Sequence, residues 1–235
     1  MTTLLVIGMG SLRLALFDLD NTLLTGDTDV LWCDFLIEQG RLDAATFAAA
    51  NADMEQRYAA GKATAQEFCA FYVSLLKGIS HADGEVLRRL FFEERIRPRL
   101  CADARALVEK HRSRGDILIL TTATNRFTTE LTAQELGIEH LIAIETESVD
   151  EVFTGKTQGV LNMREGKVTR LQQWLQARAW PDSLIQGATF YSDSVNDLPL
   201  LSAVGHPVTV DPDSKLAQEA AGRAWPTITL RRSLH

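Results

Sequence analysis

Short, continuous apolar runs that each end in polar residues constrain the fold of this chain more than any other feature. The runs cover residues 12–17, 116–120, 141–144, 188–191, 207–210 and 227–230. A run without polar alternation is typical of a strand buried on both faces, as in a parallel sheet. Between the runs, apolar residues recur at helical spacing, as at Leu171, Trp174 and Leu175. This alternation predicts an α/β fold with a doubly wound parallel sheet.

From about residue 29 to residue 95 the chain departs from this alternation. It contains helical segments at residues 30–39, 44–60, 66–76 and 84–92, and no clear strand. We therefore expect an all-helical insert, residues 26–96, within an α/β core formed by residues 1–25 and 97–235. Pro98 marks the return of the chain to the core.

Composition and charge argue against several classes of protein. The 235 residues carry a net charge of -7, whereas binding to a nucleic-acid backbone relies on an excess of Lys and Arg. No apolar run reaches the roughly 18 residues that a membrane span needs. Residues 1–12 are apolar but lack the basic region and the cleavage site of a signal peptide. The three widely spaced cysteines predict no disulfide framework and fit a cytoplasmic protein.

Carboxylates and hydroxyls follow three of the predicted strands. In open α/β sheets, ligands bind beyond the carboxyl ends of the strands, so these side chains are expected to share one crevice. Close carboxylates stay ionised at low cost only when a cation lies among them. Hard oxygen ligands without a nearby thiolate or imidazole favour Mg²⁺ over Zn²⁺. The side chains concerned are Asp18 and Asp20, Thr121 and Thr122, and Asp193 and Asp197.

This set of residue types matches the needs of phosphoryl transfer. A carboxylate such as Asp18 can attack phosphorus, and Asp20 can protonate the leaving alcohol and later activate water. Thr122 can donate to a phosphate oxygen, and Lys167 can supply positive charge. Asp193 can ligate the metal, while Asp197 can orient the metal or a bound water.

Single motifs in this chain have simpler interpretations. An Asp-x-Asp pair alone is also typical of a solvated turn that caps a helix. Gly8-Met9-Gly10 resembles the start of a dinucleotide-binding loop, but Arg13 replaces the third glycine and a strand follows instead of a helix. We therefore interpret it as an extension before the first core strand. The phosphoryl-transfer interpretation rests on four motifs taken together and in this order, and not on any one of them. The motifs are Asp18 with Asp20, Thr122, Lys167, and Asp193 with Asp197.

These four motifs resemble those of the haloacid-dehalogenase-like hydrolase superfamily, most closely those of its phosphoserine-phosphatase-like branch. The matching positions are Asp18-Leu19-Asp20-Asn21-Thr22, then Thr122 in Thr122-Ala123-Thr124, then Lys167, then Asp193-Ser194-Val195-Asn196-Asp197. The likeness spans roughly residues 14–230. It implies a Rossmann-like core, and a small hairpin around residues 154–159. It also implies that the helical insert is a cap, which closes over the substrate and excludes water.

The resemblance also implies roles for individual residues. Asp18 would be the nucleophile and a Mg²⁺ ligand, and Asp20 the general acid and base, with its main-chain carbonyl facing the metal. Asp193 would complete the protein ligands, and Asp197 would lie behind these ligands or reach the metal through a water. The substrate-binding residues would be Asp27, Tyr72, Thr122, Ala123, Arg126 and Asn196.

The cap residues bear on the choice of substrate. In phosphoserine enzymes a cap acid meets the substrate amine, and Asp27 occupies that position here. A cap arginine binds the substrate carboxylate, but Tyr72 occupies its position, and tyrosine offers no charged fork. Arg126 is a candidate for compensating cation. The expected substrate is an amino-alcohol phosphate without a carboxylate, such as histidinol phosphate, or phosphoserine, but strict specificity for phosphoserine is not expected.

Two other functions are compatible with the sequence. A phosphomutase or phosphotransferase would use the same phospho-aspartate but pass the phosphoryl group to a sugar. A non-catalytic binding module would not need the complete set of side chains found here. A dehalogenase would lack Asp20. The partner we expect is a small phosphorylated metabolite, bound by a monomer or homodimer, with neither nucleic acid nor membrane involved.

Overall fold

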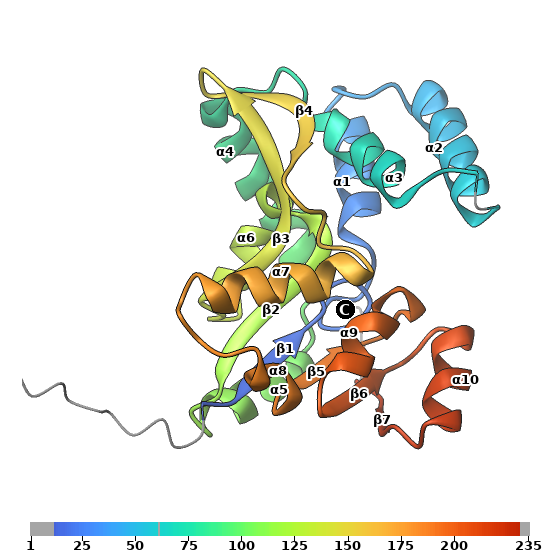
Figure 1. Cartoon of the computed structure of the whole chain (residues 1–235). Helices are drawn as coiled ribbons and strands as arrows, with labels where there is room; N and C mark the ends of the chain where they lie inside the picture. The colour runs from blue at the N-terminus through green and yellow to red at the C-terminus, as the bar shows by residue number, and fades with distance from the viewer. Residues whose placement is uncertain (1–11, 61, 231–235) are drawn as a thin grey trace, which may run out of the picture.

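The computed structural model of the chain describes residues 12–60 and 62–230, which fold around a seven-stranded sheet (Figure 1). The strand order is β4-β3-β2-β1-β5-β6-β7. All neighbouring strands are parallel except β3 and β4. The predicted doubly wound α/β fold is confirmed. The strands are β1 (Leu14–Phe17), β2 (Ile117–Asn125), β3 (His140–Val149), β4 (Val152–Gln158), β5 (Thr189–Ser192), β6 (His206–Val210) and β7 (Thr227–Ile228).

The central strand β1 explains why the first apolar run has no polar residue. All four residues of β1 are buried. It pairs in parallel with β2, where Leu14 lies opposite Ile117, and with β5, where Ala15 lies opposite Thr189. A strand with neighbours on both sides and helices on both faces has no position facing water. The chain leaves this buried environment at Asp18, at the carboxyl edge of the sheet.

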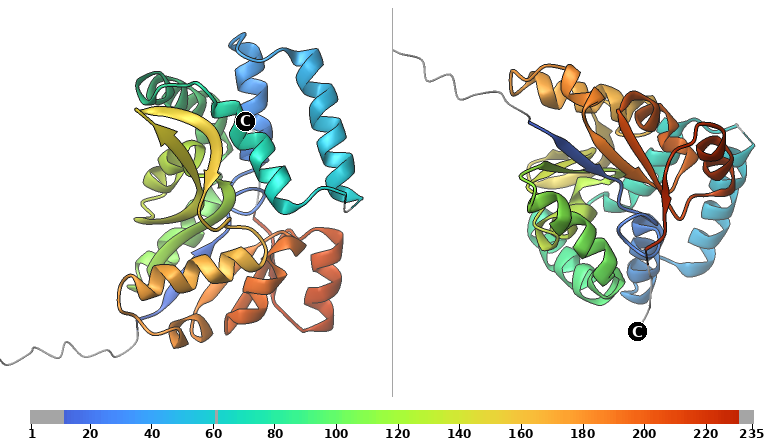
Figure 2. Two further views of the ribbon diagram at one scale, coloured as in Figure 1. Left: turned by 45° about the horizontal axis from the view of Figure 1, so that its top comes forward. Right: turned by 90° about the horizontal axis from the view of Figure 1, so that it is seen from below.

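Helices cover both faces of the sheet, as the view from below makes plain (Figure 2). Phe17 belongs to an apolar cluster with α5 and α6 on one face. Leu16 points the other way and belongs to a cluster with α7, α9 and α10. Successive side chains of a strand alternate between faces, so β1 contributes to both layers. These helices are α5 (Ala102–Arg112), α6 (Arg126–Glu135), α7 (Glu165–Gln176), α8 (Ser183–Gln186), α9 (Leu198–Ala203) and α10 (Ser214–Gly222).

The predicted helical insert is helical in the structure, apart from turns and an isolated bridge at Ser80. Trp32 of α1 packs edge-on against Phe91 of α4 and Phe127 of α6. The apolar core therefore continues from the sheet into α1 and α4. The boundary between core and cap at residues 26 and 96 stays a prediction. The helices are α1 (Thr28–Glu38), α2 (Ala44–Ala59), α3 (Ala65–Val73) and α4 (His81–Phe91), followed by a π-helical turn, Phe92–Ile96.

Strand β2 is longer than its apolar run. It was expected to end at Leu120, but it continues to Asn125 with a register shift against β3 between Thr121 and Asn125. The β-branched threonines of this stretch favour an extended chain, so the strand persists past the last aliphatic residue. The extension carries Thr122 and Thr124 to the carboxyl edge of the sheet, beside β1.

Strands β3 and β4 form a hairpin, but residues 154–158, where the hairpin was expected, lie within β4, and the turn precedes that strand. Its turn residues, Asp150 and Glu151, both have positive φ, 49° and 61°. Two such residues in succession are typical of the turn type that matches the twist of paired strands.

Residues 1–11, with the Gly8-Met9-Gly10 segment and most of the stretch assessed as a signal peptide, lie outside the described residues. Within the described residues, every helix is too short or too polar to cross a bilayer.

Candidate active site

A cavity of about 220 Å³ lies at the carboxyl ends of β1 and β5, and residues of α1, α2 and α3 also line it. Carboxylates and hydroxyls at the ends of β1, β2 and β5 line one part of the cavity, and residues 26–96 contribute two carboxylates, two aromatic rings and a thiol. The lining residues are Asp18, Asp20, Asn21, Asp27, Asp29, Tyr58, Phe68, Cys69, Thr122, Ala123, Thr124, Met163, Lys167, Asp193, Ser194, Asn196 and Asp197.

Lys167 joins two carboxylates at the floor of this cavity. Its Nζ donates to Asp18 Oδ1 and to Asp197 Oδ2, both at 2.7 Å. The side chain is 2% exposed and comes from the first turn of α7. Burial alone disfavours the ammonium, but Asp18 and Asp197 outweigh it and raise the pKa of Lys167 above its ordinary value. Lys167 therefore stays charged and fixes the positions of both carboxylates.

Thr22 links Asp18, the candidate nucleophile, to Asp193. Its Oγ1 lies 3.3 Å from Asp18 Oδ2 and 2.9 Å from Asp193 Oδ1. It also accepts a hydrogen bond of 3.0 Å from the Asp193 backbone N–H. The two carboxylates thus share one hydroxyl, although they are far apart in the sequence.

The buried carboxylates carry more negative charge than Lys167 can neutralise. Burial raises the pKa of Asp18 well above its ordinary value. Lys167 opposes this shift, while Asp197 and Asp193 add to it. Burial also raises the pKa of Asp193 to about 6, despite its bond to Thr22. Such a site favours an additional cation, and its hard oxygen donors suit Mg²⁺.

Protein side chains alone do not complete a metal site. Among the described residues, no three His, Cys, Asp or Glu side chains form a metal-binding group by themselves. Mg²⁺ commonly keeps several waters and binds through one or two carboxylates plus substrate phosphate. Asp18 and Asp193, with a main-chain carbonyl, fit that requirement.

Asp20 is held apart from this cluster by threonines. Its Oδ1 accepts from the Thr28 backbone N–H at 2.8 Å and from the Thr28 hydroxyl, and its Oδ2 accepts from Thr124 Oγ1 at 2.7 Å. Burial and the nearby Asp27 raise the pKa of Asp20 to about 7, although these hydrogen bonds oppose the rise. Asp18 and Asp20 thus lie in different environments, as expected for residues with separate roles. In this arrangement the Asp20 carboxylate is bound to hydroxyls.

Backbone and hydroxyl groups surround the rest of the floor. Thr122 is buried, and its Oγ1 accepts from the Thr124 backbone N–H at 3.1 Å. Ala123 and Asn196 line the same cavity. Asn162, which sequence reasoning missed, is fully buried and donates to the Thr122 and Ile142 carbonyls, both at 2.9 Å. It thereby ties the loop before α7, and with it Lys167, to β2 and β3.

The side of the cavity formed by the helical insert differs from the prediction. Asp27 lines the cavity and also caps α1, accepting from the Asp29 and Val30 backbone N–H groups at 2.9 and 3.1 Å. Asp29, Tyr58 and Phe68 line it too and were missed. The positions of Tyr58 and Phe68 depend on how α2 and α3 pack, and no local sequence pattern predicts that packing.

Two residues predicted to bind substrate lie elsewhere. Tyr72 is a buried residue of α3 and donates from its hydroxyl to Oδ1 of Asn51, on α2, at 2.8 Å. Arg126 turns toward β3, where it pairs with Glu145 at 2.8 and 2.9 Å and lines a separate hollow of about 340 Å³. Neither lines the cavity around Asp18. Neighbours in the sequence of a helix face different directions, so the short local match that selected Tyr72 did not fix its direction.

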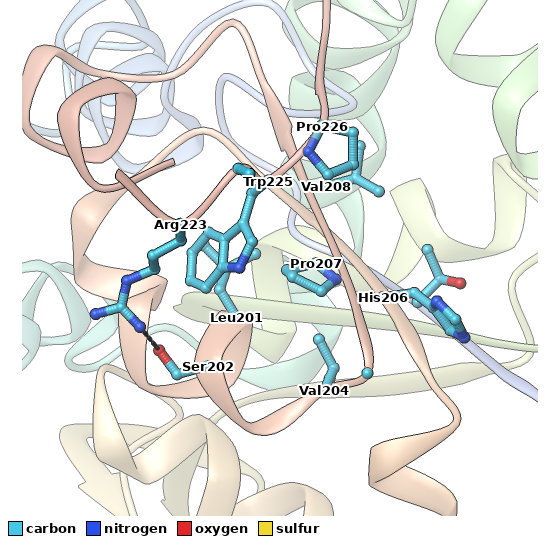
Figure 3. Close-up of a pocket in the computed structure, with 12 residues that line it drawn as sticks. Leu201, Ser202, Val204, His206, Pro207, Val208, Arg223, Trp225 and Pro226 are labelled. Atoms are coloured by element: carbon cyan, nitrogen blue, oxygen red, sulfur yellow. Dashed lines mark hydrogen bonds between the residues drawn. The ribbon is translucent and has the colours of Figure 1, made fainter. Parts of the chain in front are cut away.

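A larger hollow of about 700 Å³ lies away from this chemistry, at the start of β5 and β6 (Figure 3). Pro207, Trp225 and Pro226 form much of its surface, and Arg223 reaches Ser202 across it. Its lining contains no carboxylate. Because catalytic groups collect at the opposite edge of the sheet, we take the smaller cavity as the candidate active site.

Comparison with known proteins agrees with this geometry. The sequence profile of haloacid dehalogenase-like hydrolases matches residues 15–202. A histidinol-phosphatase from Neisseria meningitidis is 36% identical over 220 residues, which cover 93% of this chain and 99% of that protein. A phosphoserine phosphatase from Mycobacterium tuberculosis is 31% identical over 221 residues, covering 90% of this chain and 68% of that protein.

A solved structure is similar throughout. A Bordetella pertussis protein of unknown function superposes with a TM-score of 0.88 at 41% identity, covering 93% of this chain and 98% of that one. The fold described above, insert included, is therefore shared with an experimental structure.

The central ion pairs lead to a stability prediction. Replacing Lys167 with Met leaves Asp18 and Asp197 buried without a cation, so Lys167→Met should lower the free energy of unfolding at neutral pH by about 3–5 kcal/mol. The loss should shrink as the pH falls, because Asp18 can then take up a proton. Urea unfolding without divalent cations measures it.

The matched control is Lys156→Met, since Lys156 is 75% exposed. It should change the unfolding free energy by less than about 0.5 kcal/mol. A Lys167→Met protein as stable as the control would contradict the assigned role.

Proposed function

Because this chain belongs to the haloacid dehalogenase-like hydrolase family and is a phosphatase, we propose that it hydrolyses a small phosphomonoester through a phospho-aspartate on Asp18. The observation that carries the proposal is the contrast between two nearby carboxylates. Asp18 contacts Lys167 and Thr22, whereas Asp20 contacts threonines and has a pKa of about 7. Two carboxyls with separated environments suit a nucleophile and a general acid.

In the first step, an Asp18 carboxylate oxygen forms a bond to phosphorus while the bond from phosphorus to the leaving oxygen breaks. The protonated Asp20 gives its proton to that leaving oxygen, so the product departs as a neutral alcohol. Lys167, 2.7 Å from Asp18, neutralises charge on the phosphoryl oxygens, together with the Thr122 hydroxyl.

In the second step, the ionised Asp20 removes a proton from water as that water attacks phosphorus. The bond between phosphorus and Asp18 breaks, releasing inorganic phosphate and the Asp18 carboxylate. Asp20 ends protonated, ready for the next cycle. A transferase would admit an alcohol instead of water at this step.

Mg²⁺ is the cofactor that this donor set suits. Asp18 and Asp193 would hold it with the main-chain carbonyl of Asp20, and Asp197 would act through a water. When bound, it neutralises negative charge on the phosphoryl group. The surplus of buried carboxylate described above supports this assignment.

The leaving alcohol is an amino alcohol without a carboxylate, for which histidinol phosphate is our first candidate. Among the described residues that line the cavity, Lys167 is the one Lys or Arg, and it is already bound to Asp18 and Asp197. Arg164 lies 5.2 Å from the Tyr58 ring but does not line the cavity, so a substrate carboxylate inside it would be desolvated without a free cationic partner. The Neisseria relative is named for histidinol phosphate. Residues 26–96 would act as the cap that encloses this alcohol.

Asp18→Asn tests the nucleophile. The amide cannot form a stable acyl phosphate, so kcat should fall by about 10³-fold or more. The assay follows phosphate release from a panel of phosphomonoesters. Asp34→Asn, an exposed change on α1, is the matched control and should retain parental activity. If the kcat of Asp18→Asn lies within about tenfold of the kcat of the control, the mechanism is contradicted.

Removal of divalent cations tests the cofactor. Treatment with a chelator, followed by its removal, should abolish phosphate release, because Lys167 alone cannot offset the charge of the carboxylates and the phosphoryl group. Adding Mg²⁺ should restore the rate, while adding Na⁺ at equal ionic strength should not. Full activity in the chelated enzyme would rule out the metal assignment.

Substrate preference tests the leaving alcohol. We expect kcat/KM for histidinol phosphate to exceed that for phosphoserine by about 10- to 100-fold, the usual effect of an unpaired buried charge. The amide of phosphoserine is the matched control, since it removes only the carboxylate charge, and it should recover much of the difference. Faster hydrolysis of phosphoserine than of histidinol phosphate would overturn this choice.

A further inference from the structure

The carboxylate of Asp213 joins two segments of the chain that follow different strands. Asp213 directly precedes α10, and its Oδ2 accepts a hydrogen bond of 2.7 Å from the backbone N–H of Val195. In the other direction, the Asp213 backbone N–H donates to the Asp193 carbonyl oxygen at 2.8 Å. These two bonds hold the backbone on either side of Ser194, within the segment that carries both Asp193 and Asp197.

Other backbone N–H groups of this segment bind to partners nearby in the sequence. The Ser194 N–H donates to Ser192 Oγ and the Asn196 N–H to Ser194 Oγ, each at 3.2 Å. The Asp197 N–H donates to the Ser194 carbonyl oxygen at 3.0 Å. Local bonds of this kind shape a turn, but they do not fix its place relative to the sheet. The contact with Asp213 does, because Asp213 belongs to the chain beyond β6.

Capping of α10 accounts for only one of the two Asp213 oxygens. Oδ1 caps the helix by accepting from the backbone N–H groups of Lys215 and Leu216, at 2.8 and 2.9 Å. One oxygen is enough for an N-cap, and serine or asparagine would serve as well. Oδ2 is the oxygen that accepts from Val195. The second oxygen of the carboxylate is therefore explained by the contact with Val195 and not by the helix.

The chain turns sharply to bring Asp213 to this place. Thr209 of β6 lies opposite Ser192 of β5, so the two strands end side by side. Asp211, just after β6, has a φ of 40°, and Pro212 follows it. A left-handed conformation is unfavourable for a residue other than glycine, and it is retained where the surrounding structure holds it, often beside a functional site.

We propose that Asp213 is a positioning residue for the metal site, holding residues 193–197 so that the Asp193 carboxylate stays beside Asp18. Thr22 fixes this carboxylate from the side of β1, with its Oγ1 2.9 Å from Asp193 Oδ1. Asp213 fixes the same segment from the side of β6. Without the bond to Val195, Asp193 is less firmly held near Asp18, and the pair binds Mg²⁺ more weakly.

This inference rests on the proposed phosphatase function and deepens it. It assigns control of metal affinity to a residue that does not line the active-site cavity and touches neither metal nor substrate. Groups that orient a metal ligand from behind commonly change metal affinity by about 10- to 100-fold when they are removed.

Asp213→Ser separates the two functions of the side chain. Serine is a good N-cap, so α10 keeps its cap, but the shorter side chain does not reach Val195 at the same time. The matched control is Asp43→Ser. Asp43 caps α2 through the Thr46 backbone N–H at 2.8 Å and does not line the cavity.

The measurement is the Mg²⁺ concentration that raises the midpoint of thermal unfolding by a fixed increment, without substrate and at constant ionic strength. This concentration scales with the dissociation constant of Mg²⁺, because a ligand stabilises the folded state by mass action. We expect it to rise by about 10- to 100-fold in Asp213→Ser and to keep the parental value in Asp43→Ser. The Mg²⁺ concentration for half-maximal phosphate release should rise in parallel.

A merely structural role of Asp213 would lower the midpoint at every Mg²⁺ concentration without changing the concentration required. Equal Mg²⁺ requirements in Asp213→Ser and Asp43→Ser therefore overturn the inference, while the phosphatase function stands. If Asp213→Ser does not fold, Asp213→Asn decides by the same comparison, because its amide oxygen faces the two donors of α10 and its NH₂ group cannot accept from Val195. A parent that releases no phosphate and gains no stability from Mg²⁺ overturns the proposed function, and the inference with it.

Discussion

Lys167, buried between Asp18 and Asp197, is the interaction on which the rest of the site depends. Its two hydrogen bonds of 2.7 Å join the end of β1 to the segment after β5, and α7 supplies the lysine. Without this charge, several carboxylates would be buried together, and each would resist ionisation. With it, Asp18 is held in one orientation beside a donor. The remaining negative charge favours a metal ion, whose positive charge would in turn attract a phosphoryl group.

The fold produces this arrangement because β1 lies between β2 and β5. Parallel strands bring their carboxyl ends to one edge, so Asp18, Thr122 and Asp193 meet although they are distant in sequence. The helical insert then closes the cavity from the other side. In the proposed mechanism, groups on the sheet edge would contact phosphate and metal, and groups on α1–α3 would contact the alcohol. Chemistry and selectivity thus reside on different elements.

The sequence predicted the cavity residues at the ends of the strands better than those on the helices of the insert. Continuous apolar runs located β1, β2 and β5, and the residue after each run lies at a known edge of the sheet, so Asp18 and Asp193 could be named. Helices α2 and α3 offer no such rule, since the facing side of a helix depends on its packing. Tyr72 was therefore given a position that it does not occupy, and Phe68 was overlooked. Arg126 turns toward Glu145 on β3, and this contact between distant residues could not be predicted from the local sequence.

The central claim is that the phosphoryl group passes through a covalent bond to Asp18. The most direct measurement is mass spectrometry of the enzyme quenched in acid during turnover of histidinol phosphate with Mg²⁺, followed by peptide mapping. The account predicts an added mass of one phosphoryl group on the peptide that contains Asp18, and its loss when turnover is allowed to finish. A phosphoryl group found on another residue, or steady turnover with no phosphorylated protein at any quench time, would contradict it.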